Sequence, residues 1–178
     1  MDSRTVAAPA AKAGVAPVPG AVQLPDATRT EVGRLAQSLL EEALCEGSFG
    51  RLLVDLDVEA LAPLFAFAPQ GYTRRVLAST SEAEILLMGW LPGQESTVHD
   101  HGDGWGLVRV LVGTAREDRF RERANGELQV MTTRAIPTGA ILEECPGDIH
   151  RVAVPSRHVL VTLHVYAPRL NGCRSFVV

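Results

Sequence analysis

The chain has 178 residues, 46% of them hydrophobic and 21% charged, with a formal net charge of −4 at neutral pH. This length and composition are typical of a soluble globular protein with one hydrophobic core. The 17 lysines and arginines are scattered along the chain, so no basic patch favours binding to nucleic acid.

Cysteine usage and hydropathy indicate a cytoplasmic setting. Cys45, Cys145 and Cys173 are odd in number and widely spaced, which argues against a disulfide framework and against a cysteine-rich zinc site. No apolar run reaches the length of a membrane span, and the first residues lack the basic start and apolar core of a signal peptide. We therefore expect a cytoplasmic protein with no membrane partner.

The first residues differ in composition from the rest. Residues 1–25 are rich in alanine, proline, glycine and valine, a composition that gains little from folding and predicts a disordered tail. We expect residues 26–178 to form a single domain that begins with a helix. Asp26 or Thr28 is the candidate cap of that helix.

Two helices are predicted in the part of the chain before Tyr72, where the pattern of β-strands begins. Apolar residues recur at helical spacing from Thr30 to Cys45, and Gly47 and Gly50 are expected to end this helix. A second, short helix is predicted over Val58–Phe67. Both helices would pack against the β-structure formed by the residues from Tyr72 onward.

From Tyr72 onward the pattern is that of short β-strands. Apolar and polar residues alternate, or apolar residues run for five or six positions, and turn signals separate the stretches. Asn125-Gly126 predicts a two-residue hairpin turn. Many short antiparallel strands at this spacing indicate a small barrel or sandwich. The predicted strands are Thr73–Ala78, Glu84–Leu91, Gly106–Val112, Thr114–Arg121, Leu128–Ala135, Ala140–Glu144, His150–Ala153 and Val159–Tyr166.

Three histidines in this region form a candidate metal site. His99 and His101 are two residues apart, so on a strand both would face the same side. His150 follows a predicted turn and is available as a third ligand. Three neutral imidazoles with open positions suit iron(II), although zinc and copper also accept imidazole. The alternative is that His99 and His101 are exposed loop residues.

The glycines around these histidines resemble the two motifs of cupin barrels. Gly93 lies six residues before the first histidine, Gly113 ends the next predicted strand, and Pro146-Gly147 precedes His150. The usual first cupin motif adds a glutamate shortly after its histidine pair, but Gly102 to Gly106 contain none. We therefore expect a three-histidine site without a carboxylate. The implied fold is mostly β, a cupin barrel or jelly roll with two or three N-terminal helices packed on it.

Several segments together resemble the cysteine dioxygenase family over about 100 residues. They occur in the family's order and spacing, which is more specific than a cupin motif alone. The segments are Tyr72-Thr-Arg74, Trp90 with Gly93, His99-Asp-His101-Gly-Asp, His150-Arg-Val, Leu163-His-Val-Tyr166-Ala-Pro168 and Cys173.

The resemblance implies a role for residues at the metal and at the substrate. His99, His101 and His150 match the iron ligands of the family. Arg74 matches the arginine that pairs with the substrate carboxylate, a task that suits a permanently charged, two-pronged guanidinium. Tyr72 matches a tyrosine that helps shape the same pocket.

The resemblance also implies a hydrogen-bonded relay of Thr162, His164 and Tyr166, with threonine in place of the family's serine. These three residues alternate along one predicted strand and so share a face. Animal members carry a cysteine that crosslinks to the tyrosine, but Gly106 stands at that position here, so no crosslink is expected. Ala167-Pro168 matches a peptide bond that is cis in related members.

The implied activity is that of an iron(II)-dependent dioxygenase that converts L-cysteine and O2 to cysteine sulfinic acid, a step of cysteine catabolism towards taurine. The resemblance suggests a monomer. Three alternatives stay open: a 3-mercaptopropionate dioxygenase, with Arg169 or Arg174 near the pocket; a cupin enzyme of another chemistry; and a non-catalytic cupin that binds a small ligand. Cys173 is expected to be a packing thiol, and the charge run Glu117–Arg123 to be a solvated hairpin face.

Overall fold

The computed structural model describes residues 24–41, 46–155 and 157–177, so almost all of the tail expected at residues 1–25 lies outside the described residues. The described chain is mostly β, which confirms the predicted fold class. One sheet has the strand order β1-β2-β9-β4-β7, and the other β10-β3-β8-β5-β6. The strands are β1 (Thr73–Ser79), β2 (Glu84–Trp90), β3 (Val98–His99), β4 (Trp105–Val112), β5 (Thr114–Glu122), β6 (Leu128–Pro137), β7 (Ile141–Glu144), β8 (Ile149–Ala153), β9 (Leu160–Ala167) and β10 (Ser175–Phe176).

The helices come first in the chain and begin and end differently from the prediction. They are α1 (Asp26–Glu41), α2 (Glu46–Val54), α3 (Val58–Leu61) and the 3-10 turn η1 (Ala62–Leu64). The expectation that Gly47 and Gly50 end a helix is wrong, because both lie inside α2. The helix expected over Val58–Phe67 tightens into η1 after Leu61, where Pro63 provides no N–H for a longer helix.

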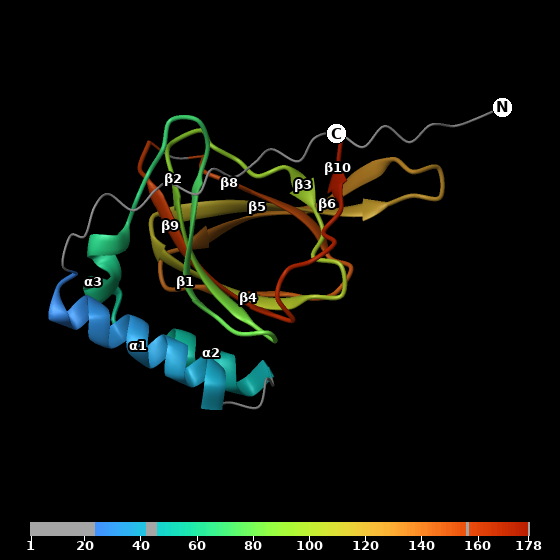
Figure 1. The fold of residues 1–178 in the computed structure, drawn as a ribbon. Coiled ribbons are helices and arrows are strands. Elements are labelled where there is room, and N and C mark those ends of the chain that lie inside the picture. Colours follow the sequence, from blue (N-terminus) through green and yellow to red (C-terminus); the bar gives the residue numbers. More distant parts are fainter. Residues whose placement is uncertain (1–23, 42–45, 156, 178) are drawn as a thin grey trace.

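The helices cover the outer face of the first sheet (Figure 1). β2 is buried along its whole length, because one set of its side chains faces the helices and the other faces the barrel interior. Ile85 and Leu87 belong to the cluster that includes Leu35 of α1 and Leu53 of α2. Burial of these apolar faces, at about 25 cal/mol per Å², holds the helices on the sheet.

The barrel interior lies between the two sheets. Leu86 and Trp90 of the first sheet share a cluster with Ala115 and Val152 of the second. Towards one end of the barrel this apolar lining gives way to polar residues. Cross-strand pairing places Glu84, Tyr166, Gly106 and Glu144 side by side in one row across four strands of the first sheet.

The hairpin between β5 and β6 differs slightly from the predicted two-residue turn. Arg123 and Glu127 close it through a backbone hydrogen bond of 2.9 Å, which leaves three residues in the loop. Gly126 has a φ of 83°, a left-handed conformation that glycine adopts without steric cost. This is the three-residue hairpin loop with a glycine bulge.

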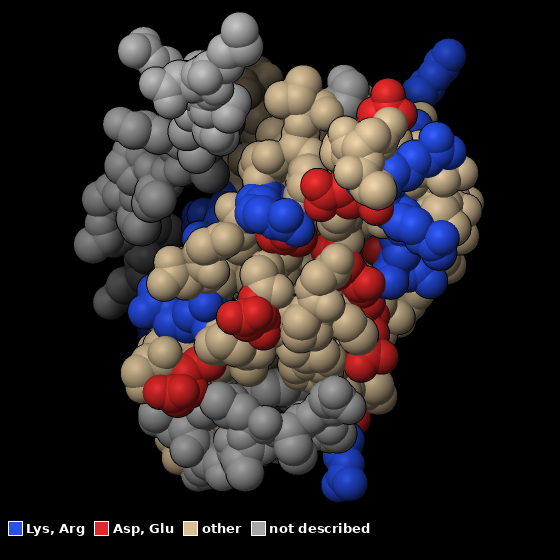
Figure 2. Space-filling model, turned by 90° about the vertical axis from the view of Figure 1, so that its right-hand side faces the viewer, with Lys and Arg blue, Asp and Glu red and all other residues tan. Residues whose placement is uncertain are grey.

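Charged side chains of both signs lie on the face shown in Figure 2. Acidic and basic side chains are interspersed over the described part of the face in Figure 2. No helix among the described residues has the length and apolar character that crossing a membrane requires.

Candidate metal centre

Strands β3 and β8 bring two of the three histidines together. They pair at one position, with His99 opposite His150. Directly opposed residues of antiparallel strands point to the same face, so both imidazoles enter the barrel interior. β3 ends at His99, and His101 therefore lies in the turn after it, not on the same strand as expected.

Asp100 stabilises this turn through hydrogen bonds to the backbone. Its buried carboxylate accepts hydrogen bonds from the backbone N–H of Gly102, at 3.2 Å, and of Arg174, at 2.9 Å. The guanidinium of Arg174 adds an ion pair at 2.6 Å. Asp100 thus anchors the turn to the C-terminal segment and leaves His101 free to point inward. Asp100 itself is not part of the ligand cluster.

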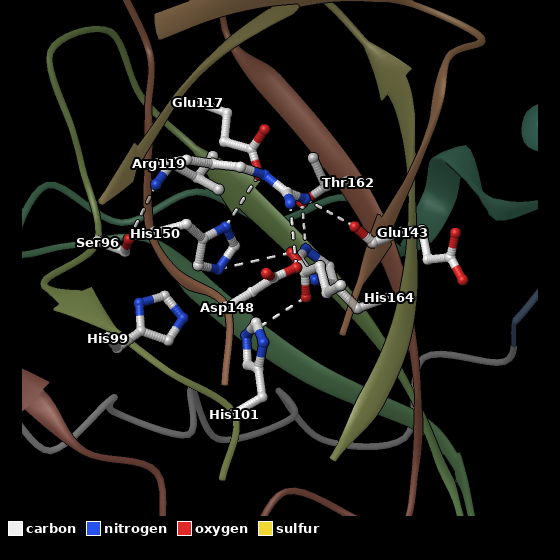
Figure 3. Close-up of polar contacts among 12 residues, drawn as sticks. Ser96, His99, His101, Glu117, Arg119, Glu143, Asp148, His150, Thr162 and His164 are labelled. Carbon is white, nitrogen blue, oxygen red and sulfur yellow. Dashed lines mark hydrogen bonds and ion pairs between the residues drawn. The ribbon is translucent and has the colours of Figure 1, made fainter. Parts of the chain in front are cut away.

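The three histidines converge on one point. One ring nitrogen from each of His99, His101 and His150 lies within 4.8 Å of the other two. The three rings face a common space in Figure 3. Within the described residues, the buried Nε2 atoms of His101 and His150 make no hydrogen bond. Buried nitrogens without a hydrogen bond, aimed at a common point, are what a divalent cation with imidazole ligands requires.

The electrostatic surroundings keep two of the imidazoles neutral, as ligation requires. Burial lowers the pKa of His99 to about 4 and that of His101 to about 3, and the neighbouring histidines add to the effect. For His150, burial also lowers the pKa, but the carboxylates of Glu144 and Glu117 outweigh it and raise the pKa overall. A cation at the site would compete with a proton for His150.

Glu117 orients His150 from outside the ligand cluster. Its carboxylate accepts a hydrogen bond from His150 Nδ1 at 3.2 Å, which leaves Nε2 for a metal. Burial alone would raise the pKa of Glu117, but hydrogen bonds from His150 and Arg134 hold it at about 2. The expectation of a solvated face is wrong for Glu117 and Asp118, which are both buried. Alternation from the apolar Ala115 was the signal that Glu117 faces inward.

The residues of the expected relay are in contact. Thr162, His164 and Tyr166 are all buried on β9. His164 Nε2 lies 2.8 Å from the hydroxyl of Thr162, and its Nδ1 lies 2.9 Å from the hydroxyl of Tyr166. Trp90 Nε1 donates to the Thr162 hydroxyl at 3.1 Å and extends the chain by one residue. Burial lowers the pKa of His164 well below its usual value and raises that of Tyr166 well above it.

A buried carboxyl group that sequence reasoning missed lies beside two of the histidines. Glu144 ends β7, is 2% exposed, and accepts a hydrogen bond from the Tyr166 hydroxyl at 3.0 Å. Its two oxygens lie 3.3 Å from His101 Nε2 and 3.6 Å from His150 Nε2. Among the described residues, the cluster that could hold a metal is formed by the three histidines and does not include Glu144.

The two residues expected at the substrate also line the interior. Arg74 on β1 lies opposite Met88, which in turn lies opposite Thr162, so Arg74 shares the inner face of the relay. Its guanidinium forms an ion pair with the buried Glu84 at 3.0 Å. The ring of Tyr72 stacks on that of Trp90, with centroids 4.1 Å apart.

A cavity of about 640 Å³ has His101 among its lining residues. Asp103, Arg169 and Leu170 also line it, whereas His99, His150 and Arg74 do not. The Ala167-Pro168 peptide bond beside it is cis. Cys173 is exposed, so the expectation of a packing thiol is wrong.

Comparisons with known proteins identify the family of the chain. The family described as "Cysteine dioxygenase type I" matches residues 55–177. Curated relatives include cysteine dioxygenase type 1 of Rattus norvegicus, 26% identical over 111 residues, and of Danio rerio, 29% identical over 115 residues. Each match covers 59% of this chain and 55% of the relative, so the chain spans about half the length of these curated relatives.

Solved structures support the fold. A Thermus thermophilus protein superposes with a TM-score of 0.53 at 21% identity, over 61% of this chain and 94% of that chain. An uncharacterized Klebsiella pneumoniae protein with a double-stranded β-helix domain superposes with a TM-score of 0.54 at 20% identity, over 69% of this chain and 96% of that chain. With the family match over residues 55–177, the chain belongs to the cysteine dioxygenase type I family of cupins.

Proposed function

We propose that the chain is an iron(II)-dependent thiol dioxygenase that converts L-cysteine and O2 to cysteine sulfinic acid, as a step of cysteine catabolism. One observation carries the proposal: three convergent imidazoles and the guanidinium of Arg74 line the same barrel interior. Family membership supports an oxidoreductase of this type.

His99, His101 and His150 would hold the iron through their Nε2 atoms. Iron(II), when bound, supplies the one-electron chemistry that lets O2 react with a thiol. The protein holds two of these imidazoles neutral by burial, and Glu117 fixes the ring of His150 through Nδ1. The preorganised site then needs little rearrangement to bind the metal.

Arg74 would bind the carboxylate of the substrate. A guanidinium forms two parallel, charge-assisted hydrogen bonds with a carboxylate and stays charged at any relevant pH. The ion pair with Glu84 uses Nη2 and holds the side chain on the inner face. Tyr72, packed flat against Trp90, would form one wall of the pocket.

Tyr166 would present a protonated hydroxyl beside the metal ligands, with its hydrogen donated to Glu144 in the structure. Because burial and the nearby Glu144 carboxylate raise the pKa of Tyr166 well above its usual value, the phenol keeps its proton at neutral pH. Contacts with His164 and Glu144 hold its hydroxyl close to the metal ligands. The proton is therefore held at the phenol oxygen, beside the space that a substrate would occupy.

The test is O2 uptake by purified, iron(II)-loaded protein with L-cysteine and with 3-mercaptopropionate, with the product identified by mass. We expect uptake with L-cysteine at one O2 per sulfinate formed, and none in a His99→Ala variant. Absence of uptake with either thiol, despite bound iron, would contradict the dioxygenase proposal.

A second candidate is 3-mercaptopropionate oxidation. It is favoured by Arg169, a second guanidinium that lines the cavity at His101, whereas Arg74 is already paired with Glu84. The two substrates are distinguished by Arg74→Gln and Arg169→Gln. Loss of cysteine turnover only in the Arg74 variant supports cysteine, and loss of 3-mercaptopropionate turnover only in the Arg169 variant supports the alternative.

A further inference from the structure

One oxygen of Glu84 joins two parts of the interior that are far apart in the sequence. Glu84 begins β2 and is 3% exposed. Its Oε1 accepts a hydrogen bond from Arg74 Nη2 at 3.0 Å and another from the backbone N–H of Leu170 at 3.2 Å. A buried carboxylate needs charged or polar partners, and this one has a guanidinium from β1 and an amide from the segment after β9.

The guanidinium that Glu84 holds lies among the residues of the proposed active site. Glu84 is paired with Tyr166 in the sheet, so the ion pair forms beside the phenol. Burial is the main cause that raises the pKa of Tyr166, and the charge of Arg74 acts against it, which places the guanidinium within electrostatic reach of the phenol. A guanidinium has five N–H donors, so the contact with Glu84 leaves donors for a second carboxylate on the same group.

The segment that Glu84 holds at Leu170 lies against the turn that begins at His101. Residues 168–171 line the cavity beside that histidine. A Cβ at Gly104 would lie 3.4 Å from Leu170 Cδ2, so the leucine side chain packs on the turn. Glu84 therefore fixes the guanidinium of Arg74 relative to this wall of the cavity.

We propose that Glu84 is a positioning residue for Arg74, which forms the site for the substrate carboxylate before the thiol binds. The inference rests on the proposed function, in which Arg74 binds that carboxylate. The side chain of Arg74 is 33% exposed, so without Glu84 it would be free to turn towards solvent. A long side chain that must be ordered on binding costs affinity. Glu84 thus favours thiols that carry a carboxylate and does not affect thiols that lack one.

The test compares two thiols that differ only in the carboxylate, L-cysteine and cysteamine. The full chain is stripped of metal, loaded with cobalt(II) and titrated anaerobically with each thiol. The absorption band of a cobalt-bound thiolate then gives the Kd without any turnover. We expect the unaltered protein to bind L-cysteine at least about tenfold more tightly than cysteamine, and Glu84→Ala to lose most of that preference. The Kd for cysteamine should not change.

Further variants separate positioning from general damage to the fold. Glu84→Gln keeps an acceptor oxygen of the same reach and should recover part of the preference for L-cysteine. Glu82→Ala is the matched control, because it removes an exposed carboxylate two residues earlier, and it should change neither Kd. An Arg74→Ala protein has no guanidinium to position, so adding Glu84→Ala to it should have no further effect on the preference.

The outcomes distinguish this inference from the proposed function. If the unaltered protein prefers L-cysteine and both Glu84 variants keep that preference in full, Glu84 does not position Arg74, although the carboxylate site stands. If the unaltered protein binds neither thiol, or both equally, the carboxylate site of the proposed function fails, and the inference fails with it. Should Glu84→Ala not fold, as judged by circular dichroism, Glu84→Gln decides. A reduced preference for L-cysteine in that variant supports the proposal, and an unchanged preference overturns it.

Discussion

Substitution of Gly106 by alanine tests whether Tyr166 lies where the structure places it. The added Cβ would lie 2.5 Å and 2.6 Å from two carbons of the Tyr166 ring. Non-bonded carbons normally lie about 3.5–4.0 Å apart, so the ring must retreat by about 1 Å. That shift stretches its hydrogen bonds to His164, at 2.9 Å, and to Glu144, at 3.0 Å, beyond the usual range.

We expect Gly106→Ala to lower the free energy of unfolding by about 2–4 kcal/mol, from overpacking together with the weakened buried hydrogen bonds. For a protein of this size, that corresponds to a fall in Tm of roughly 5–15 °C. Thermal unfolding of metal-free protein by circular dichroism is the assay, and O2 uptake by the iron-loaded variant should also fall.

Gly33→Ala is the matched control for this prediction. Gly33 lies within α1, is exposed, and has no atom within 4 Å of an added Cβ. Alanine is the better helix former, so this variant should gain up to about 1 kcal/mol of stability. If Gly106→Ala were as stable and active as the unaltered protein, the position of Tyr166 would be wrong.

Three further predictions follow from other parts of the chain. Arg74→Lys should raise the KM for L-cysteine by roughly 10–100-fold with a smaller effect on kcat. Lysine can keep the ion pair with Glu84 but cannot form the two-pronged contact with the substrate carboxylate. Steady-state O2 uptake measures the KM, and an unchanged KM would contradict the prediction. Asp118→Asn should lower the free energy of unfolding by about 2 kcal/mol at about pH 7 in urea. Burial alone would raise the pKa of Asp118, but hydrogen bonds from Arg151 and Thr133 hold it below its usual value. The contribution of the Asp118 carboxylate to the free energy of unfolding is therefore lost as the pH falls through that lowered pKa. If the difference in stability between the two proteins grew in acid, this prediction would be contradicted. Removing the metal by chelation should lower Tm, and restoring it at about 100 times its Kd should return about 2.7 kcal/mol; an alanine variant of any one of the three histidines should show no such gain.

The strands could be predicted from the sequence because alternation and turn residues act locally. The stretch predicted as Glu84–Leu91 is β2, Glu84–Trp90. β3 and β10 have two residues each and carry no local pattern, so they were missed. Gly47 and Gly50 predict a helix end, but glycine inside a helix costs only about 1 kcal/mol relative to alanine, and α2 continues through both.

Residues of the candidate site could be predicted from the sequence only where they belong to a recognisable motif. The three histidines follow from their spacing and the relay from the resemblance, and the structure brings them together. Glu144 carries no such label, and the two adjacent glutamates Glu143 and Glu144 give no hint of which one faces inward. The choice is made by the register of β7 against β4, where Glu144 lies opposite Gly106. Long-range pairing of this kind cannot be read from one strand.

The chain of contacts from Trp90 to Glu144 has a fixed polarity. The Tyr166 hydroxyl donates its one hydrogen to Glu144, so its oxygen accepts from His164 Nδ1–H. His164 Nε2 then has no proton and accepts from the Thr162 hydroxyl, whose oxygen accepts in turn from Trp90 Nε1–H. The direction of the Tyr166 hydrogen bond therefore selects a single tautomer of His164, and every hydrogen in the chain points from Trp90 towards Glu144.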